Sequence, residues 1–145
     1  MSYDVVVAPT DGSDPAEAGL ERAIELARAF DATVHVLFVV DESDRPGDWD
    51  VVVERQERAG EAALDAAFGI GADAGVAVER HLRRGRPAEA IVAFAAECDA
   101  DAIVMATHGR SGFDRIRHAG STTERVLRSA SVPVLAVPPD GTGRS

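Results

Sequence analysis

Four short apolar runs and one alternating run recur along the chain, and segments with helical periodicity separate them. Continuous β-branched runs of this length are typical of strands that are buried on both faces of a sheet. The order of strand, helix and strand, with short connections, predicts a parallel sheet covered by helices on both faces. The fold class we expect is a three-layer α/β/α domain with five parallel strands in the order 3-2-1-4-5. The expected strands are residues 3–9, 33–41, 75–82, 100–107 and 132–138.

The expected helices have recognisable start signals. Asp14 is suited to the N-cap of the first helix, Pro15 to its first position, and Glu17 completes a capping box. That helix should end near Phe30. A long polar helix should follow over 49–70, and another should open in the stretch GRPAEAIVAFAAEC. Ser121 with Glu124 forms a second capping box, which predicts a last helix anchored in the core by its Val126 and Leu127 side chains.

Length and composition indicate one globular domain. We expect residues 1–139 to form it and 140–145 to be a disordered tail, because 145 residues can bury one core. No stretch is apolar enough to span a membrane, and the first residues lack the features of a secretory signal. The single cysteine, Cys98, excludes an internal disulfide and lies in an apolar helical pattern, so we interpret it as a packed thiol. These features favour a cytoplasmic protein.

The charge balance limits the partners of the chain. The net charge is −10, and all 15 basic residues are arginine. A surface of this sign repels nucleic acids and anionic membranes, so neither is expected as a partner. Two origins of the acidity stay open. A salty cytoplasm would screen the repulsion, and a GC-rich genome would favour arginine codons.

One stretch departs from this acidity and indicates an anion site. Between Arg110 and Arg128 there are five arginines against two acids, among small residues that let a backbone approach a ligand. The stretch follows the fourth expected strand. In open α/β sheets, ligands bind at the carboxyl ends of the strands where the strand order reverses, which for this order is between strands one and four.

The stretches VVVAPTDGSDPAEAGLERAIELA, FVVDES and AIVMATHGRSG…GSTTERVLRSASVPVLAV together resemble the universal stress protein family, whose fold resembles that of adenine nucleotide alpha-hydrolases. The last stretch is similar to the pattern G-x2-G-x9-G-[ST] of nucleotide-binding members. Two departures stand out. Ala106 occupies the first glycine position, and ten residues rather than nine separate Gly109 from Gly120.

The resemblance implies a binding site for ATP or AMP, with or without Mg²⁺. Asp11 would lie near the ribose or a phosphate-bound metal, while Thr10 and the Val39 backbone would flank the adenine. The glycines and the hydroxyl of Ser121 would approach the phosphates, where amides at a helix N-terminus and the helix dipole favour anions. The implied nucleotide-binding residues are Pro9, Thr10, Asp11, Val39, Met105, Ala106, Gly109, Arg110, Gly112, Gly120, Ser121, Thr122 and Thr123.

Other functions are weighed against this interpretation. A family member that binds no nucleotide and acts as a dimeric interaction module is the alternative, and the two departures favour it. No catalytic arrangement is visible, so at most slow hydrolysis of bound ATP is expected. His108 and His118 have no third ligand at a fitting spacing, so we expect no metal site apart from Mg-ATP at Asp11. The apolar strand around Val132 to Val137 predicts a homodimer through a sheet edge.

Overall fold

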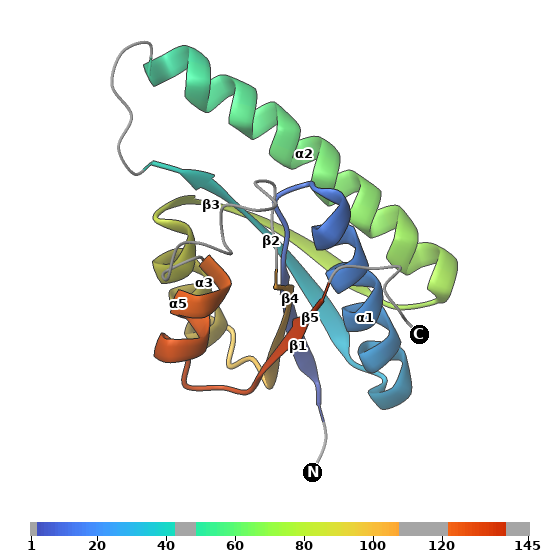
Figure 1. The fold of residues 1–145 in the computed structure, drawn as a ribbon. Coiled ribbons are helices and arrows are strands. Elements are labelled where there is room, and N and C mark those ends of the chain that lie inside the picture. The colour runs from blue at the N-terminus through green and yellow to red at the C-terminus, as the bar shows by residue number, and fades with distance from the viewer. Residues whose placement is uncertain (1–2, 43–48, 108–121, 139–145) are drawn as a thin grey trace.

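A computed structural model of the chain describes residues 3–42, 49–107 and 122–138. Figure 1 shows the elements in their order, and the last helix carries the label α5. The strands are β1 (Val5–Pro9), β2 (Thr33–Asp41), β3 (Val78–Gly85), β4 (Ala102–Ala106) and β5 (Val134–Val137). The helices are α1 (Asp14–Phe30), α2 (Trp49–Ala74), α3 (Pro87–Glu97) and α5 (Thr122–Ser129).

The five strands form one parallel sheet in the order β3-β2-β1-β4-β5, as the sequence predicts. Helices α1 and α2 cover one face, and α3 and α5 cover the other (Figure 1). Alternate residues of each strand therefore enter different layers of the core. Val6 and Val34 face α1 and α2, whereas Val7, Leu37 and Ile103 face α3 and α5, all fully buried. This two-sided burial explains why the central strands are continuous apolar runs.

The start of α1 corrects the expected cap by one residue. Ser13, not Asp14, is the N-cap, because its backbone is still extended and its Oγ accepts a hydrogen bond of 3.3 Å from the Ala16 amide. Asp14 is already the first helical residue. Serine and aspartate cap about equally well, so the sequence could not decide between two adjacent candidates.

The second helix and the third strand also differ in extent from the prediction. Helix α2 continues past Ile70 to Ala74 and ends before Gly75, whose φ is +75°. At Gly71 inside this helix there is no room for a side chain, because an added Cβ would overlap Cγ2 of Val78 on the sheet. The strand that the alternating pattern predicted over 75–82 begins at Val78 and runs on to Gly85.

The last helix is anchored by fewer residues than expected. Val126 is fully buried, but half of Leu127 is exposed to solvent, so the expectation that both side chains enter the core is wrong for Leu127. Thr123 is the other buried residue of α5, one helical turn before Val126. Ser121, the expected cap, and the expected tail 140–145 lie outside the described residues. Within the described ranges, none of the helices is long and apolar enough to cross a membrane.

Candidate functional site

The sheet opens between its two central strands at the carboxyl end. Pairing between β1 and β4 comprises Val6↔Ala102 and Val7↔Ile103, although both strands continue, to Pro9 and Ala106. At their ends each strand pairs with its outer neighbour instead, at Pro9↔Leu37 and Ala106↔Val137. This is the point where the strand order reverses, and the opening is where ligands of open α/β sheets bind.

The turn after β1 is held by its own side chains. The Thr10 amide donates to the Leu37 carbonyl at 2.9 Å and extends the β1–β2 ladder by one bond. The Thr10 hydroxyl accepts a 3.0 Å bond from the Gly12 amide, and an Asp11 carboxylate oxygen accepts one from the Ser13 amide, also at 3.0 Å. Gly12 has a φ of +83°, which only glycine adopts readily. These bonds fix the turn beside the opening before any ligand arrives.

The end of β4 lies under a helix on each side. Helix α1 approaches so closely that a Cβ on Gly19 would lie 3.0 Å from the Ala106 amide nitrogen. From the other face, the buried Thr123 hydroxyl donates a 2.6 Å bond to the Ala106 carbonyl. This bond ties the first turn of α5 to the end of β4. Thr123 is thus engaged with the backbone, while its neighbour Thr122 is exposed.

Thr107, directly after β4, is a residue that the sequence patterns did not single out. Its amide donates to the Val137 carbonyl at 2.8 Å, but its hydroxyl is buried and has no hydrogen-bond partner within the described part of the chain. A buried unsatisfied hydroxyl is unfavourable by about 1–3 kcal/mol. The only signal in the sequence was its place between a buried strand and the expected phosphate loop.

Ala106 causes no backbone strain. Among the described residues other than glycine, positive φ angles occur at Asp31 and Asp99 only. An alanine at the end of β4 therefore adopts an ordinary conformation. The departure from the glycine of the family pattern adds a methyl group and leaves the course of the backbone intact.

Val39 lies on the neighbouring strand at the same edge. The β1 ladder ends at Leu37, two residues earlier, whereas β2 continues to pair with β3 as far as Asp41↔Gly85. The half-buried Val39 side chain packs against the core cluster under α3 and α5 that also contains Met105. Val39 and Met105 thus share one layer on the two strands that flank β1.

Eight of the thirteen expected nucleotide-binding residues are described, and they lie at the ends of β1, β2 and β4 and the start of α5. The remaining five, on which the phosphate contacts depend, lie outside the described residues. They are Gly109, Arg110, Gly112, Gly120 and Ser121.

Residues 2–138 match the model of the universal stress protein family. The chain belongs to the universal stress protein family. A universal stress protein of Methanocaldococcus jannaschii is 39% identical over 140 residues, which are 93% of this chain and 82% of the relative. Among solved structures, a universal stress protein from Archaeoglobus fulgidus in complex with dAMP has a TM-score of 0.70 and 31% identity, covering 94% of this chain and 99% of that one. A universal stress protein in complex with cAMP has a TM-score of 0.78 and 27% identity, covering 97% and 100%.

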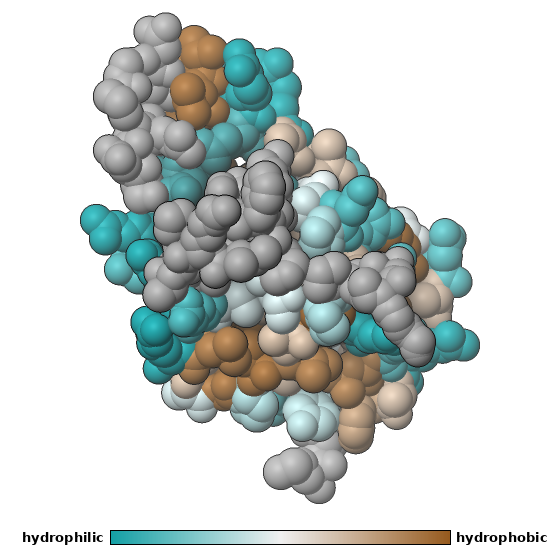
Figure 2. Space-filling model, in the orientation of Figure 1, coloured by the Kyte–Doolittle hydropathy of each residue, from teal (hydrophilic) through white to brown (hydrophobic). Residues whose placement is uncertain are grey.

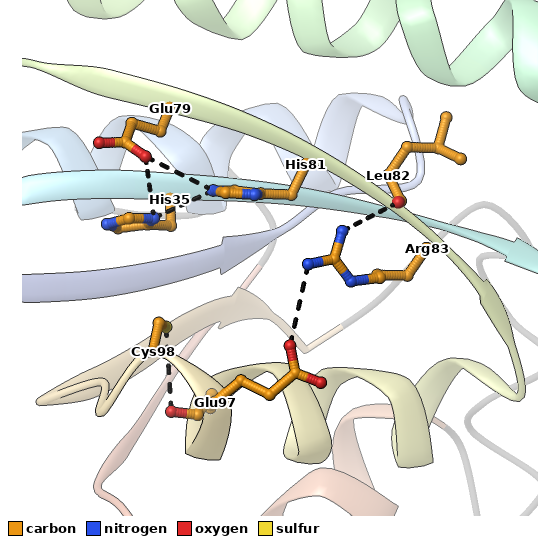
Figure 3. Close-up of polar contacts among 8 residues, drawn as sticks. His35, Glu79, His81, Leu82, Arg83, Glu97 and Cys98 are labelled. Carbon is orange, nitrogen blue, oxygen red and sulfur yellow. Dashed lines mark hydrogen bonds and ion pairs between the residues drawn. The ribbon is translucent and has the colours of Figure 1, made fainter.

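This universal stress protein also has a second polar cluster, on the α3 face of β2 and β3 (Figure 3). The His35 Nδ1 and His81 Nε2 atoms are 3.0 Å apart, and a carboxylate oxygen of Glu79 lies 3.8 Å from the first and 3.9 Å from the second. Burial, together with the nearby His35 and Arg83, lowers the pKa of His81. The cluster was not expected from the sequence, because His35 precedes Glu79 by 44 positions and His81 by 46.

Proposed function

We propose that this universal stress protein binds AMP or ATP in the opening between β1 and β4, with Mg²⁺ accompanying ATP. The observation that carries the proposal is the end of β1–β4 pairing at Val7↔Ile103, two or three residues before either strand ends. The solved relatives in complex with dAMP and cAMP support an adenine nucleotide as the ligand class. In this proposal residues 1–139 act as one domain.

The phosphates belong near the start of α5. The bond from Thr123 to the Ala106 carbonyl keeps the first turn of α5 at the end of β4, at the edge of the opening. Amides of a first helical turn have no partners within the helix, and the helix dipole favours an anion there. The glycines of the preceding loop and the hydroxyl of Ser121 complete this phosphate site, and the Arg110 side chain offsets phosphate charge.

The adenosine belongs on the β1 and β2 side. Pro9 ends β1, Thr10 follows it and Val39 lies on β2, while Met105 is buried on β4 in the same core layer as Val39. The Asp11 carboxylate is held by the Ser13 amide in a position to accept a ribose hydroxyl or to ligate a Mg²⁺ ion on the phosphates. We assign the unsatisfied Thr107 hydroxyl to the nucleotide as well, since it is buried directly after β4, one of the two strands that border the opening.

Calorimetry with AMP, ATP and Mg-ATP tests the proposal. The wild type, shown to be folded and free of nucleotide, should bind at millimolar concentration or below. Gly120→Val places a β-branched side chain where a phosphate must approach and should abolish binding. Gly69→Ala is the matched control, since Gly69 is a helical glycine with nothing within 4 Å of an added Cβ. No heat from the wild type at millimolar nucleotide would refute the proposal.

A second variant tests the assignment of Thr107. Thr107→Val keeps the shape of the side chain but removes the hydroxyl. The free protein should become more stable, because the unsatisfied group is gone, while nucleotide affinity should fall. A loss of both stability and affinity would mean that the hydroxyl has a partner in the free protein, and the assignment would be wrong.

The alternative function, a dimeric interaction module, is favoured by a different surface. Strand β5 is an edge of the sheet that pairs only with β4 in the described ranges, and Leu135 on it is 48% exposed. Figure 2 shows apolar side chains, in brown, gathered in a band over the β5 region. An apolar edge strand can pair with a second copy across a two-fold axis. We propose a homodimer through 132–137, which is compatible with either function.

A further inference from the structure

We propose that His35, Glu79 and His81 bind a divalent transition-metal ion, with Zn²⁺ as the best match to the donor atoms. The three residues are brought together by the pairing of β2 with β3, in which His35 lies opposite Glu79 and Leu37 opposite His81. Alternate residues of a strand share a face, so all three side chains project toward α3. Figure 3 shows their polar ends pointing toward one another.

The distances fit one ion bound by three ligands. The donor atoms form a triangle with sides of 3.0, 3.8 and 3.9 Å, and the point in their plane that is equidistant from all three lies about 2.1 Å from each. Zn–N and Zn–O bonds in proteins are about 2.0–2.2 Å long. The arrangement therefore needs little movement of the donor atoms to accommodate the ion.

A hydrogen bond between the two imidazoles explains only part of this geometry. Such a bond accounts for the 3.0 Å separation of the two nitrogens, but not for a carboxylate nearly equidistant from both. The ring centroids are 5.2 Å apart and the planes differ by 18°, so the rings meet edge to edge rather than face to face. When an ion binds, this hydrogen bond is lost: the ring that donated it carries its proton on the other ring nitrogen, and both lone pairs turn toward the ion beside Glu79.

The donor set selects the class of ion. Two imidazole nitrogens and one carboxylate oxygen suit Zn²⁺ and similar ions, whereas Ca²⁺ and Mg²⁺ prefer oxygen ligands alone. Three protein ligands leave one coordination position for water. Because the Glu79 side chain is 60% exposed, an ion can enter from solvent without opening the core.

Neighbouring side chains hold the two rings in place. The Phe94 ring of α3 packs 4.7 Å from the His81 ring and 6.4 Å from the His35 ring, measured between centroids. The Arg83 guanidinium lies over Phe94 and forms a 3.8 Å ion pair with Glu97 (Figure 3), which partly offsets the positive charge nearest the site. Imidazole rings that are already held in place by their neighbours lose less conformational entropy when they bind a metal ion.

The site connects the edge strand β3 to β2. Since its ligands come from two strands, a bound ion should stabilise their pairing and raise the melting temperature of the folded protein. No nucleotide is involved, so this inference stands independently of the proposed function.

The experiment is a calorimetric titration of the metal-free, nucleotide-free protein with ZnCl₂. The wild type should bind one Zn²⁺ per chain. His81→Asn and Glu79→Gln should each weaken binding at least tenfold and abolish the zinc-induced rise in melting temperature. His108→Asn/His118→Asn, which removes the other two histidines of the chain, is the matched control and should bind like the wild type. If His81→Asn does not fold, Glu79→Gln alone tests the proposal. The Glu79 side chain is exposed, so this substitution should leave the fold intact.

X-ray absorption of the zinc-loaded wild type provides a separate readout. Nitrogen and oxygen ligands at about 2.0–2.1 Å, without a sulfur shell near 2.3 Å, are expected. A sulfur shell would assign the zinc to Cys98 and overturn the proposal. Loss of binding in the His108/His118 control, or unchanged binding in Glu79→Gln, would do so as well.

Discussion

Replacing Gly19 with alanine probes the packing of α1 onto the end of β4, where the proposed nucleotide site lies. The added Cβ would be 3.0 Å from the Ala106 amide nitrogen and 3.4 Å from the Met105 carbonyl carbon. Both are backbone atoms of a buried strand, so the helix rather than a side chain has to move by a few tenths of an ångström. That movement also shifts the Asp11–Ser13 turn, which leads directly into α1.

Two opposing effects set the expected change in stability. Alanine is preferred over glycine in a helix by about 0.5–1 kcal/mol. Overpacking a tight core position costs about 1–3 kcal/mol. The overpacking effect should win here because the contact is with backbone, giving a net loss of about 1 kcal/mol and a fall of roughly 3 °C in melting temperature. Nucleotide affinity should fall with it.

Gly69→Ala is the control, because it gains the same helix preference in open space and should raise stability by about 0.5–1 kcal/mol. Urea unfolding followed by circular dichroism measures both variants on one scale. If Gly19→Ala stabilises the protein as much as Gly69→Ala does, the close approach of α1 to β4 is wrong and the reasoning fails.

Three further predictions concern the dimer, the charge and the strand ends. Leu135→Asp should shift the protein from dimer to monomer in light scattering, and a wild-type monomer at tens of micromolar would exclude the proposed edge pairing. Thermal melts should shift upward between low and molar KCl if the charge of −10 is an adaptation to salt, and an unchanged midpoint favours codon bias. The Asp101 carboxylate accepts bonds from the Val5 and Asp4 amides, which lower its pKa. The ionised Asp101 carboxylate therefore stabilises the folded protein above the ordinary pKa of 3.8, and this stabilisation is lost as the pH falls through the lowered pKa. The difference in unfolding free energy between the wild type and Asp101→Asn should accordingly shrink as the pH is lowered.

The central strands could be predicted because continuous runs of β-branched residues favour buried parallel strands. The run TVHVLFVVD is β2 at the same two ends as expected, since a continuous β-branched run with a polar residue after it fits a buried parallel strand and little else. The alternation of strands and helices predicted a parallel sheet, and the expected order 3-2-1-4-5, which the structure has, placed the candidate site at the β1–β4 edge.

Details that depend on packing were not predictable. Leu127 fits the apolar pattern of the last helix as well as Val126 does, but α5 has only eight residues, and its contact with the sheet lies along Thr123 and Val126. The pattern predicted that the second helix ends at Ile70, but α2 continues through Gly71, which lies close to Val78 on the sheet. The Thr107 hydroxyl could be recognised as unsatisfied only once its surroundings were known.

The two proposed sites depend on different features of the sheet, one on its strand order and the other on its register, and both include a residue of β2. The nucleotide site follows from topology, because any chain with this strand order opens at the same edge. The metal site follows from register, because a shift of β3 by one residue would turn Glu79 and His81 to the opposite face. His35 and Val39 lie on the same face of β2, four residues and about 13 Å apart, with the fully buried Leu37 between them. An ion at His35 therefore cannot contact a nucleotide at Val39, and loss of one site should leave binding at the other unchanged.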